Sequence, residues 1–275
     1  MDFIINNFDM LFNSEENFKK LEEVILDLAV KGKLVPQNPD DEPASVLLKK
    51  IKAEKEKLIK EKKIKKEKEL EPIKEDEIPF KIPDGWEWVR LGEVIEFTEN
   101  LNIQEKLSKD TIINYVDIDA IDNVNFKIKE VKQKAVEELS SRARRILKKG
   151  YIFYSMVRPY LRNIAIIEDE KENYIGTTGA SVFKPYKIET KFIFNILLSP
   201  YINNNHLELL KGFNSPSITQ EQFIHTIIPV PPLAEQKRIV EKVDRLMALC
   251  DDLENKVEKS QKEFEKIIES AMQMI

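Results

Sequence analysis

A chain of 275 residues has room for one large domain or two modest ones. Its formal net charge of −5 argues against a protein whose whole surface coats nucleic acid, but it leaves room for a local basic site. A single cysteine, Cys250, excludes an intramolecular disulfide, and the lack of a membrane-length apolar run or a basic leader predicts a cytoplasmic protein.

The first predicted element is a helix over residues 14–31. Asn13 and Glu16 have the spacing of a capping box at its start, and Gly32 is a typical stop signal at its end. Between them, apolar residues recur by three, four and three, which predicts one apolar stripe. The members of that stripe are Phe18, Leu21, Ile25 and Leu28.

The next stretch alternates between breaks and charge. Residues 33–43 contain three prolines and cannot be helical, so a second helix is predicted to begin near Ala44 with Asp41 as its cap. Residues 60–69 are almost wholly Lys and Glu, a pattern typical of a solvated helical arm rather than of a phosphate-binding tail. Residues 71–83 are predicted to be a linker.

From residue 86 to 229 the chain becomes rich in β-branched and aromatic residues. Strands are predicted at residues 89–97, 115–121, 124–128, 151–156, 163–167 and 180–184. Helices are predicted at residues 192–198, 201–210 and 220–225, the last one capped by Thr219. No internal repeat is visible.

The last predicted element is one long helix that starts near Pro232. Apolar residues recur alternately by four and three in an a/d heptad seam, with Ser260 as its one polar position. The seam contains Ile239, Val243, Leu246, Cys250, Leu253, Val257 and Phe264. A rod of about 60 Å cannot bury one narrow stripe by itself, so it needs a partner helix from this chain or from another copy. An ordinary amphipathic terminal helix is the alternative.

Together these elements predict an α+β chain, in which one mixed α/β domain is flanked by N-terminal helices and a long C-terminal coiled-coil helix. The predicted boundaries are residues 1–75 for the helical region, 76–231 for the domain and 232–275 for the C-terminal helix.

The central domain has one concentrated basic feature. Between Glu138 and Glu168 there is no acidic residue, while arginines, lysines and tyrosines are interleaved. Cations release counterions from phosphates and arginine can grip guanine, so this window is the candidate DNA surface. Some of its members are expected to be salt-bridged scaffold instead. The candidates are Arg142, Arg144, Arg145, Lys148, Lys149, Tyr154, Arg158, Tyr160 and Arg162.

Two polar loops could join this surface. Residues 176–179 connect two strands and residues 212–220 lead into the capped helix, and both offer hydroxyls and amides suited to phosphates or base edges. A plain structural turn is the alternative for each. The candidates are Thr177, Thr178, Asn214, Ser215 and Ser217.

Catalytic patterns are weak in this sequence. No glycine-rich phosphate loop is present, and His206, His225 and the single cysteine have no metal-ligand spacing, so no metal site and no catalytic residue are predicted. Glu130-Val-Lys132, after several aspartates, faintly resembles part of a nuclease site, but such a triplet is expected by chance in so charged a chain.

Four stretches in the same order resemble type I restriction-modification specificity subunits, and the likeness covers nearly the whole chain. The stretches are Gly32-Lys-Leu-Val-Pro-Gln-Asn-Pro-Asp-Asp-Glu-Pro-Ala-Ser45, Ile82-Pro-Asp-Gly-Trp-Glu-Trp-Val-Arg-Leu-Gly92, Gly150-Tyr-Ile-Phe-Tyr-Ser-Met-Val-Arg-Pro159 and Ile228-Pro-Val-Pro-Pro-Leu-Ala-Glu-Gln-Lys-Arg-Ile-Val240. The family's usual subunit has two target-recognition domains, each of which reads half of a bipartite DNA site. This chain has one copy of each region and therefore resembles a half-length form with a single target-recognition domain.

The resemblance implies a non-catalytic subunit that binds double-stranded DNA and docks methyltransferase subunits, which restriction subunits may join. S-adenosylmethionine would be bound by the methyltransferase, so no cofactor is expected in this chain. A symmetric homodimer would restore two recognition domains and predicts an inverted-repeat target. Two alternatives remain open: a structural coiled-coil adaptor without DNA specificity, and a nuclease or methyltransferase that acts alone.

Overall fold

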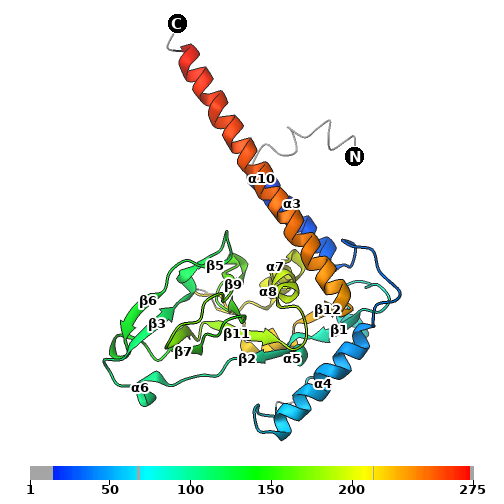
Figure 1. The fold of residues 1–275 in the computed structure, drawn as a ribbon, viewed down its shortest axis with the longest axis vertical. Coiled ribbons are helices and arrows are strands. Elements are labelled where there is room, and N and C mark those ends of the chain that lie inside the picture. Colours follow the sequence, from blue (N-terminus) through cyan, green and yellow to red (C-terminus); the bar gives the residue numbers. More distant parts are fainter. Residues whose placement is uncertain (1–14, 67–68, 213, 273–275) are drawn as a thin grey trace.

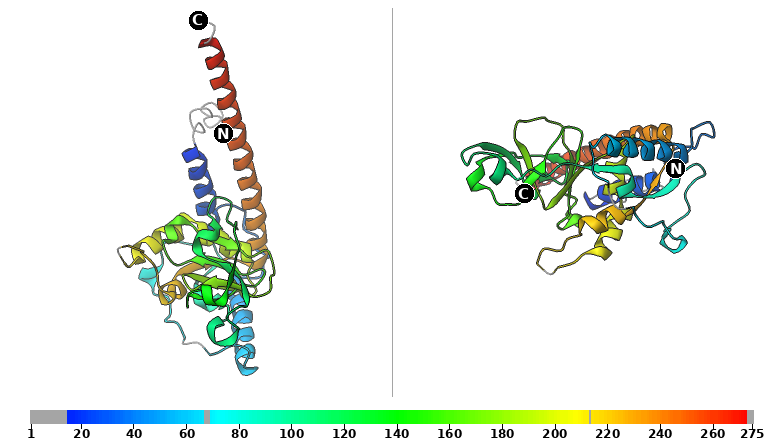
Figure 2. Two further views of the ribbon diagram at one scale, coloured as in Figure 1. Left: turned by 90° about the vertical axis from the view of Figure 1, so that its left-hand side faces the viewer. Right: turned by 90° about the horizontal axis from the view of Figure 1, so that it is seen from below.

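The computed structural model describes residues 15–66, 69–212 and 214–272, and its elements form three groups along the chain (Figure 1). Two N-terminal helices are blue, a β-rich central part runs from cyan to yellow, and one long helix is orange to red. The long helix projects away from the β-rich part, and the second N-terminal helix points to the opposite side (Figures 1 and 2).

Helix α3 (Glu15–Val30) confirms the first predicted helix, although its predicted cap, Asn13, lies outside the described residues. Two residues after the last helical residue, Val30, Gly32 has a left-handed backbone with φ of 65°. The N–H of Lys33 donates back to the carbonyl of Leu28 at 2.8 Å. Glycine suits this closing motif because other residues are strained at positive φ.

Two predictions around helix α4 (Ala44–Lys60) are wrong. Asp41 does not cap the helix, because its carboxylate instead pairs with Arg238 of the C-terminal helix at 2.6 Å. The charged run at residues 60–69 does not extend the helix, which ends at Lys60 and is followed by a turn in which Lys62 has a φ of 56°. A segment without an apolar face has nothing to bury, and charge pairs alone stabilise a helix only weakly.

Three segments that are far apart in the sequence meet at the buried carboxylate of Glu235. Its oxygens accept hydrogen bonds from Trp86 Nε1 at 3.0 Å and from Gln37 Nε2 at 2.6 Å. Burial raises the pKa of Glu235, and these two hydrogen bonds act in the opposite direction. The adjacent Gln236 accepts from Glu189 N at 3.0 Å and donates to Pro231 O at 2.9 Å. Buried polar groups are costly when unpaired, so these bonds fix the relative positions of the segments.

The β-rich part begins and ends in one pair of antiparallel strands, β1 (Glu87–Arg90) and β12 (Ile227–Val230). Glu87 lies opposite Val230, so the chain enters and leaves this part at the same place. Figure 1 shows the pair beside the base of the long helix.

The single strand predicted for residues 89–97 is interrupted. A helical turn, α5 (Leu91–Val94), separates β1 from β2 (Ile95–Phe97). The carboxylate of Glu93 accepts a hydrogen bond from the backbone N–H of Arg90 at 2.8 Å, which closes the turn.

Two four-stranded sheets form the body of the β-rich part (Figure 1). One has the order β2-β11-β8-β9 and is antiparallel throughout. The other has the order β6-β3-β10-β7, in which β10 and β3 are parallel. The remaining strands of these sheets are β3 (Ile112–Val116), β6 (Lys132–Ala135), β7 (Ala143–Ile146), β8 (Ile152–Ser155), β9 (Ile164–Ile166), β10 (Tyr174–Thr177) and β11 (Ala180–Pro185).

The predicted strands at 151–156, 163–167 and 180–184 are confirmed by β8, β9 and β11. The strand predicted at 115–121 begins three residues earlier and ends at Val116, before a 3-10 turn. Of the strand predicted at 124–128, only Lys127–Ile128 form a strand, β5. This strand pairs with β4 (Ile121–Asp122) in a small hairpin. Strands β6, β7, β10 and β12 were not predicted.

The two sheets share a core. Val116 and Tyr174 of one sheet are buried in the same cluster as Phe153 and Val182 of the other. At Gly176 the layers approach so closely that an added Cβ would lie 2.9 Å from a side-chain atom of Leu147 and 3.3 Å from Phe153. This position therefore cannot hold a larger residue without movement of the neighbouring side chains.

The three predicted helices of the central part are confirmed as α7 (Thr190–Leu198), α8 (Pro200–Leu209) and α9 (Gln220–His225). Thr219 caps α9 as predicted, since its hydroxyl accepts from Gln222 N at 3.1 Å. Helix α7 contacts α3 and α10 and so joins the sheets to the helical part. The short helical segments are α6 (Ile103–Lys106), η1 (Glu75–Glu77), η2 (Ile118–Ala120), η3 (Val136–Glu138) and η4 (Pro159–Leu161).

Helix α10 (Leu233–Met272) is one continuous helix, as predicted. The first half of its seam packs within the chain: Ile239, Val243 and Cys250 are buried in the same core cluster as Ile25 of α3. Cys250 therefore behaves as a small apolar residue. Figure 2 shows α3 alongside this half of α10.

Among the described residues, none packs over the second half of the seam, which continues with Ile267 three positions after Phe264. The side chains of Phe264 and Ile267 are 64% and 65% exposed. Between the two halves, the seam positions that are half-buried are Leu246, Leu253 and Val257. The partner helix that the seam requires thus comes from this chain for only the first half of α10.

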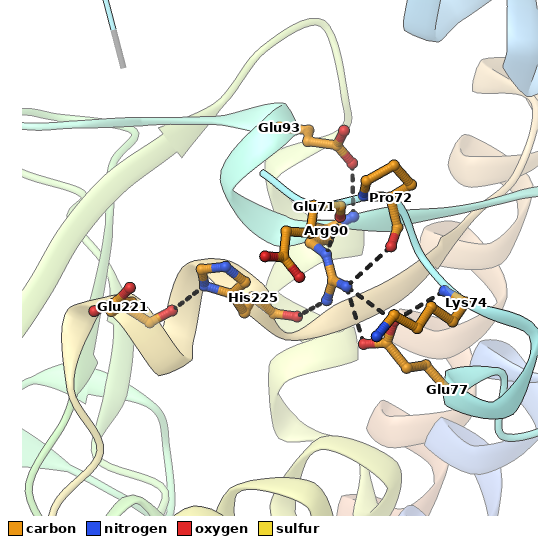
Figure 3. Close-up of polar contacts among 8 residues, drawn as sticks. All are labelled: Glu71, Pro72, Lys74, Glu77, Arg90, Glu93, Glu221 and His225. Carbon is orange, nitrogen blue, oxygen red and sulfur yellow. Dashed lines mark hydrogen bonds and ion pairs between the residues drawn. The ribbon is translucent and has the colours of Figure 1, made fainter. Parts of the chain in front are cut away.

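Arg90 at the end of β1 ties two further segments together (Figure 3). Its Nε donates to Glu71 O at 2.7 Å, and its NH1 donates to His225 O at 3.0 Å. Its NH2 contacts Pro72 O at 3.5 Å and the carboxylate of Glu77 at 2.9 Å. The predicted linker is thereby pinned to the end of α9. A guanidinium suits this position because its planar fork can serve several acceptors at once.

We predict that Arg90→Ala lowers the free energy of unfolding by about 3 kcal/mol, because several part-buried acceptors lose their buried donor. Arg90→Lys should recover less than half of this loss, since one ammonium cannot reach all the acceptors. Urea denaturation measures both, with Arg142→Ala as the control, because Arg142 is exposed. A change below about 0.5 kcal/mol for Arg90→Ala would contradict the assigned role.

Candidate nucleic-acid interface

Strand β7 carries the centre of the predicted basic surface. Arg142 is exposed just before the strand, and Arg144 and Arg145 within it are half-buried. The pairing of β7 with β10 shifts register here: Ala143 faces Thr177 and Arg145 faces Gly176, so Arg144 is an extra residue. Such β-bulges bend a strand and re-aim its side chains.

Arg142, Arg144 and Arg145 have no carboxylate partner among the described residues. The Nε of Arg144 donates to Ser141 O at 2.7 Å. The guanidinium of Arg145 donates to Asn100 Oδ1 at 3.1 Å and to Gln220 Oε1 at 3.2 Å. Burial lowers the pKa of Arg145. Three positive charges without counter-ions make this strand attractive to an anionic ligand.

The two predicted polar loops both meet this strand or its neighbours. Thr178 N donates to Arg142 O at 2.8 Å, which brings the first loop against the start of β7. Arg158 N donates to Pro216 O at 2.8 Å, and its guanidinium donates to Asn214 O at 2.9 Å. The adjoining Met156 N donates to Gly179 O at 2.9 Å, so the loops are linked through one segment.

Other predicted residues lie on the margin of this arrangement. Ser215 is exposed, and Ser217 is half-buried in a backbone bridge with Lys211. Tyr160 is exposed on η4 beside Arg158. The remaining two, Lys148 and Lys149, follow β7.

The two lysines differ in their surroundings. Lys148 lies 3.6 Å from the carboxylate of Glu99 and 5.9 Å from the centre of the Tyr151 ring. Lys149 is exposed. Lys148 is therefore partly neutralised and its neighbour is better placed for a ligand.

Three of the predicted residues serve the fold instead. Tyr154 is only 3% exposed, and its hydroxyl lies 2.7 Å from His206 Nδ1. Thr177 is buried and accepts from Gly179 N at 3.2 Å. Arg162 forms an ion pair with Glu23 of α3. Tyr154 and Thr177 cannot reach a ligand at the surface, and Arg162 already has a partner, so the proposed surface omits all three.

Sequence reasoning missed Asn100 and did not single out Gln220 within the second polar loop. Asn100 lies 45 positions from Arg145 in the sequence, and only the pairing of its backbone with β7 brings it near. No local pattern signals such a contact.

The faint nuclease-like triplet has a structural explanation. Lys132 lies 3.1 Å from Asp119 and 3.8 Å from Glu130, as a surface ion-pair group. Within residues 15–66, 69–212 and 214–272, no three His, Cys, Asp or Glu side chains are grouped so as to hold a metal ion. Among the described helices, none combines the length and the apolarity of a membrane span.

Comparison with known proteins assigns this arrangement of two sheets, flanking helices and a basic strand to a protein family. Residues 83–261 match the family model described as the type I restriction modification DNA specificity domain. The chain belongs to this family, which confirms the resemblance read from the four sequence motifs.

Particular relatives support the assignment. The specificity subunits of the type I restriction enzymes EcoAI and EcoEI of Escherichia coli are 34% and 33% identical over 267 residues. These alignments cover 92% of this chain but 44% and 43% of the relatives, so the chain spans less than half of their length. Both are named as specificity subunits, in agreement with the expectation of a non-catalytic role.

Solved structures agree on the fold. The crystal structure of an HsdS subunit from Thermoanaerobacter tengcongensis matches with a TM-score of 0.63 and 34% identity, over 72% of this chain and 51% of that chain. A chain from a structure described as the basis of complex assembly and conformational transition of the type I R-M system matches with a TM-score of 0.64 and 36% identity. That match covers 70% of this chain and 50% of the other.

The buried contact of Tyr154 with His206 predicts a pH-dependent stability. His206 is fully buried, with Nε2 3.0 Å from Thr226 Oγ1, and burial lowers its pKa from 6.5 to about 4. The unfolded chain takes up the proton first as the pH falls. The free energy of unfolding should therefore drop by about 3 kcal/mol between pH 7 and pH 4 through this group.

Urea denaturation from pH 7 to pH 4 tests this, with His206→Gln as the matched variant because glutamine does not titrate in that range. Between pH 7 and pH 4, the free energy of unfolding of the wild-type chain should fall by about 3 kcal/mol more than that of His206→Gln. Parallel curves would show that His206 does not control the slope.

Proposed function

We propose that this chain recognises one half of a bipartite DNA site as the specificity subunit of a type I restriction-modification complex. The observation that carries the proposal is the bulged strand β7 beside two polar loops: Arg144 and Arg145 in the strand and Arg142 just before it have no carboxylate partner among the described residues. Cations of this kind bind phosphates with strong salt dependence, and arginine can also read guanine. The names of the relatives support the same function.

The regions of the chain have different roles in this proposal. Residues 76–231 act as the target-recognition domain, while helices α3, α4 and α10 of the flanking regions 1–75 and 232–275 dock methyltransferase subunits. Those subunits bind S-adenosylmethionine and carry out methylation, and restriction subunits can join them. The chain itself contributes binding and no chemistry.

A second copy of the chain completes the bipartite site. The uncovered seam residues Phe264 and Ile267 on α10 support a dimer, because an apolar helix face of this length is unfavourable in water. Two identical recognition domains related by a two-fold axis would read an inverted repeat, and the helices would set its spacer.

Reversing Arg142, Arg144 and Arg145 to Glu should weaken binding to duplex DNA at least about 100-fold at 0.1 M salt, because the phosphate contacts are lost and replaced by repulsion. Fluorescence anisotropy with a labelled duplex measures this. The matched control reverses three exposed lysines of α4, Lys49, Lys52 and Lys60, which changes the net charge equally. Equal losses in both triple variants would mean that net charge, not this surface, governs binding.

Phe264→Asp together with Ile267→Asp should convert the dimer into a folded monomer, since both side chains are exposed within the chain itself. Sedimentation velocity measures the mass. Lys266→Asp is the control: it replaces a positive by a negative charge at an exposed position outside the seam, and it should leave the dimer intact. A wild-type monomer, or a dimer in all three proteins, would remove the seam from the proposed interface.

A further inference from the structure

The guanidinium of Arg145 is held in place by two side-chain amides from distant segments. Asn100 follows β2 and Gln220 is the first residue of α9, yet their oxygens accept from NH1 and NH2 of Arg145 at 3.1 and 3.2 Å. Backbone bonds support this position, because Ile146 N donates to Glu99 O and Leu101 N donates to Arg144 O. The group is thus built from three separate elements.

The environment of Arg145 is unusual for a surface arginine. Its Nε is buried without a hydrogen-bond partner, and the guanidinium has no carboxylate partner among the described residues. The nearby Glu99 pairs with Lys148 instead. Two neutral amides position the cation but leave its charge uncompensated. A long side chain held in this way loses little further freedom when it binds a ligand.

The two amides add hydrogen-bonding groups of a particular kind. Asn100 and Gln220 are exposed and turn their oxygens toward Arg145, so their NH2 groups keep free donors at the surface. Arginine pairs with O6 and N7 of guanine, and asparagine or glutamine pairs with adenine, in the major groove. These three residue types together match base edges better than phosphates.

The surrounding residues suit a different task. Arg142 is exposed before β7, and Arg158, exposed before η4, donates from its guanidinium to the carbonyl of Asn214 in the second polar loop. Exposed cations and loop groups of this sort contact phosphates, which position a protein on DNA but carry no sequence information.

We propose that Arg145, held by Asn100 and Gln220, reads a guanine in the major groove of the target, and that the two amides determine the specificity of the adjoining base pair. This inference rests on the proposed DNA-recognition function and names the residues that set its specificity. A structural role, in which the three residues only join the β2–α6 loop to α9, is the alternative that the experiment must separate.

The test begins with selection of bound duplexes from a randomised pool by the full-length wild-type chain, followed by affinity measurements on the selected duplex. Arg145→Lys keeps the charge but cannot make the paired contact, so its affinity for the selected duplex should fall about 10- to 100-fold. Arg142→Lys, the matched exchange at an exposed arginine, should change affinity less than about threefold.

Substitution of each base pair in the selected duplex then locates the contact. At one G·C pair, the wild-type chain should discriminate against A·T, and Arg145→Lys should not. The double variant Asn100→Ala, Gln220→Ala should lose discrimination at that pair and its neighbour while it keeps the wild-type affinity for non-specific duplex. This double variant decides the question if Arg145→Lys fails to fold.

The outcomes separate the two levels of the proposal. A wild-type chain that selects no sequence overturns the proposed function. A chain that selects a site which Arg145→Lys and the double variant discriminate equally well overturns this inference alone. If those variants lower the melting temperature but leave discrimination unchanged, the three residues are structural.

Discussion

The buried carboxylate of Glu235 is the contact on which the arrangement of the chain depends. It joins the segment after α3, through Gln37, to the entrance of the β-rich part, through Trp86, at the start of α10. A buried acceptor that holds two donors tolerates little displacement, because each broken bond leaves an unpaired polar group. Three of the four family motifs supply this contact, through Gln37, Trp86 and Glu235, whereas the motif at residues 150–159 reaches the basic surface with Arg158.

The basic surface is positioned indirectly by these fastenings. Arg90 fixes the linker to the end of α9, and α9 begins with Gln220, which contacts Arg145. The ion pair of Arg162 with Glu23 connects the same part of the chain to α3. The sheets and helices thus hold the surface through contacts on several sides.

Local patterns predicted the elements whose signals are contained in one segment. The helix stripes, the Thr219 cap and the apolar strands β8, β9 and β11 were all correct. Strand β7 was missed because it is basic, and the arm after Lys60 was wrong because charge spacing does not reveal where apolar partners end. Tyr154 was assigned to the basic surface because it lies among arginines and lysines in the sequence. Its buried contact with His206 joins positions 52 residues apart, which no local pattern reveals.

The pairing of β1 with β12 has a wider consequence. The whole β-rich part is inserted between two adjacent strand positions, with Glu87 opposite Val230, so its ends are neighbours in space. Segments with adjacent ends can be replaced as units without disturbing the host fold. The β-rich part is therefore an insert whose two ends adjoin, and the sequence between β1 and β12 can be exchanged as one unit while the long helices keep their own sequence.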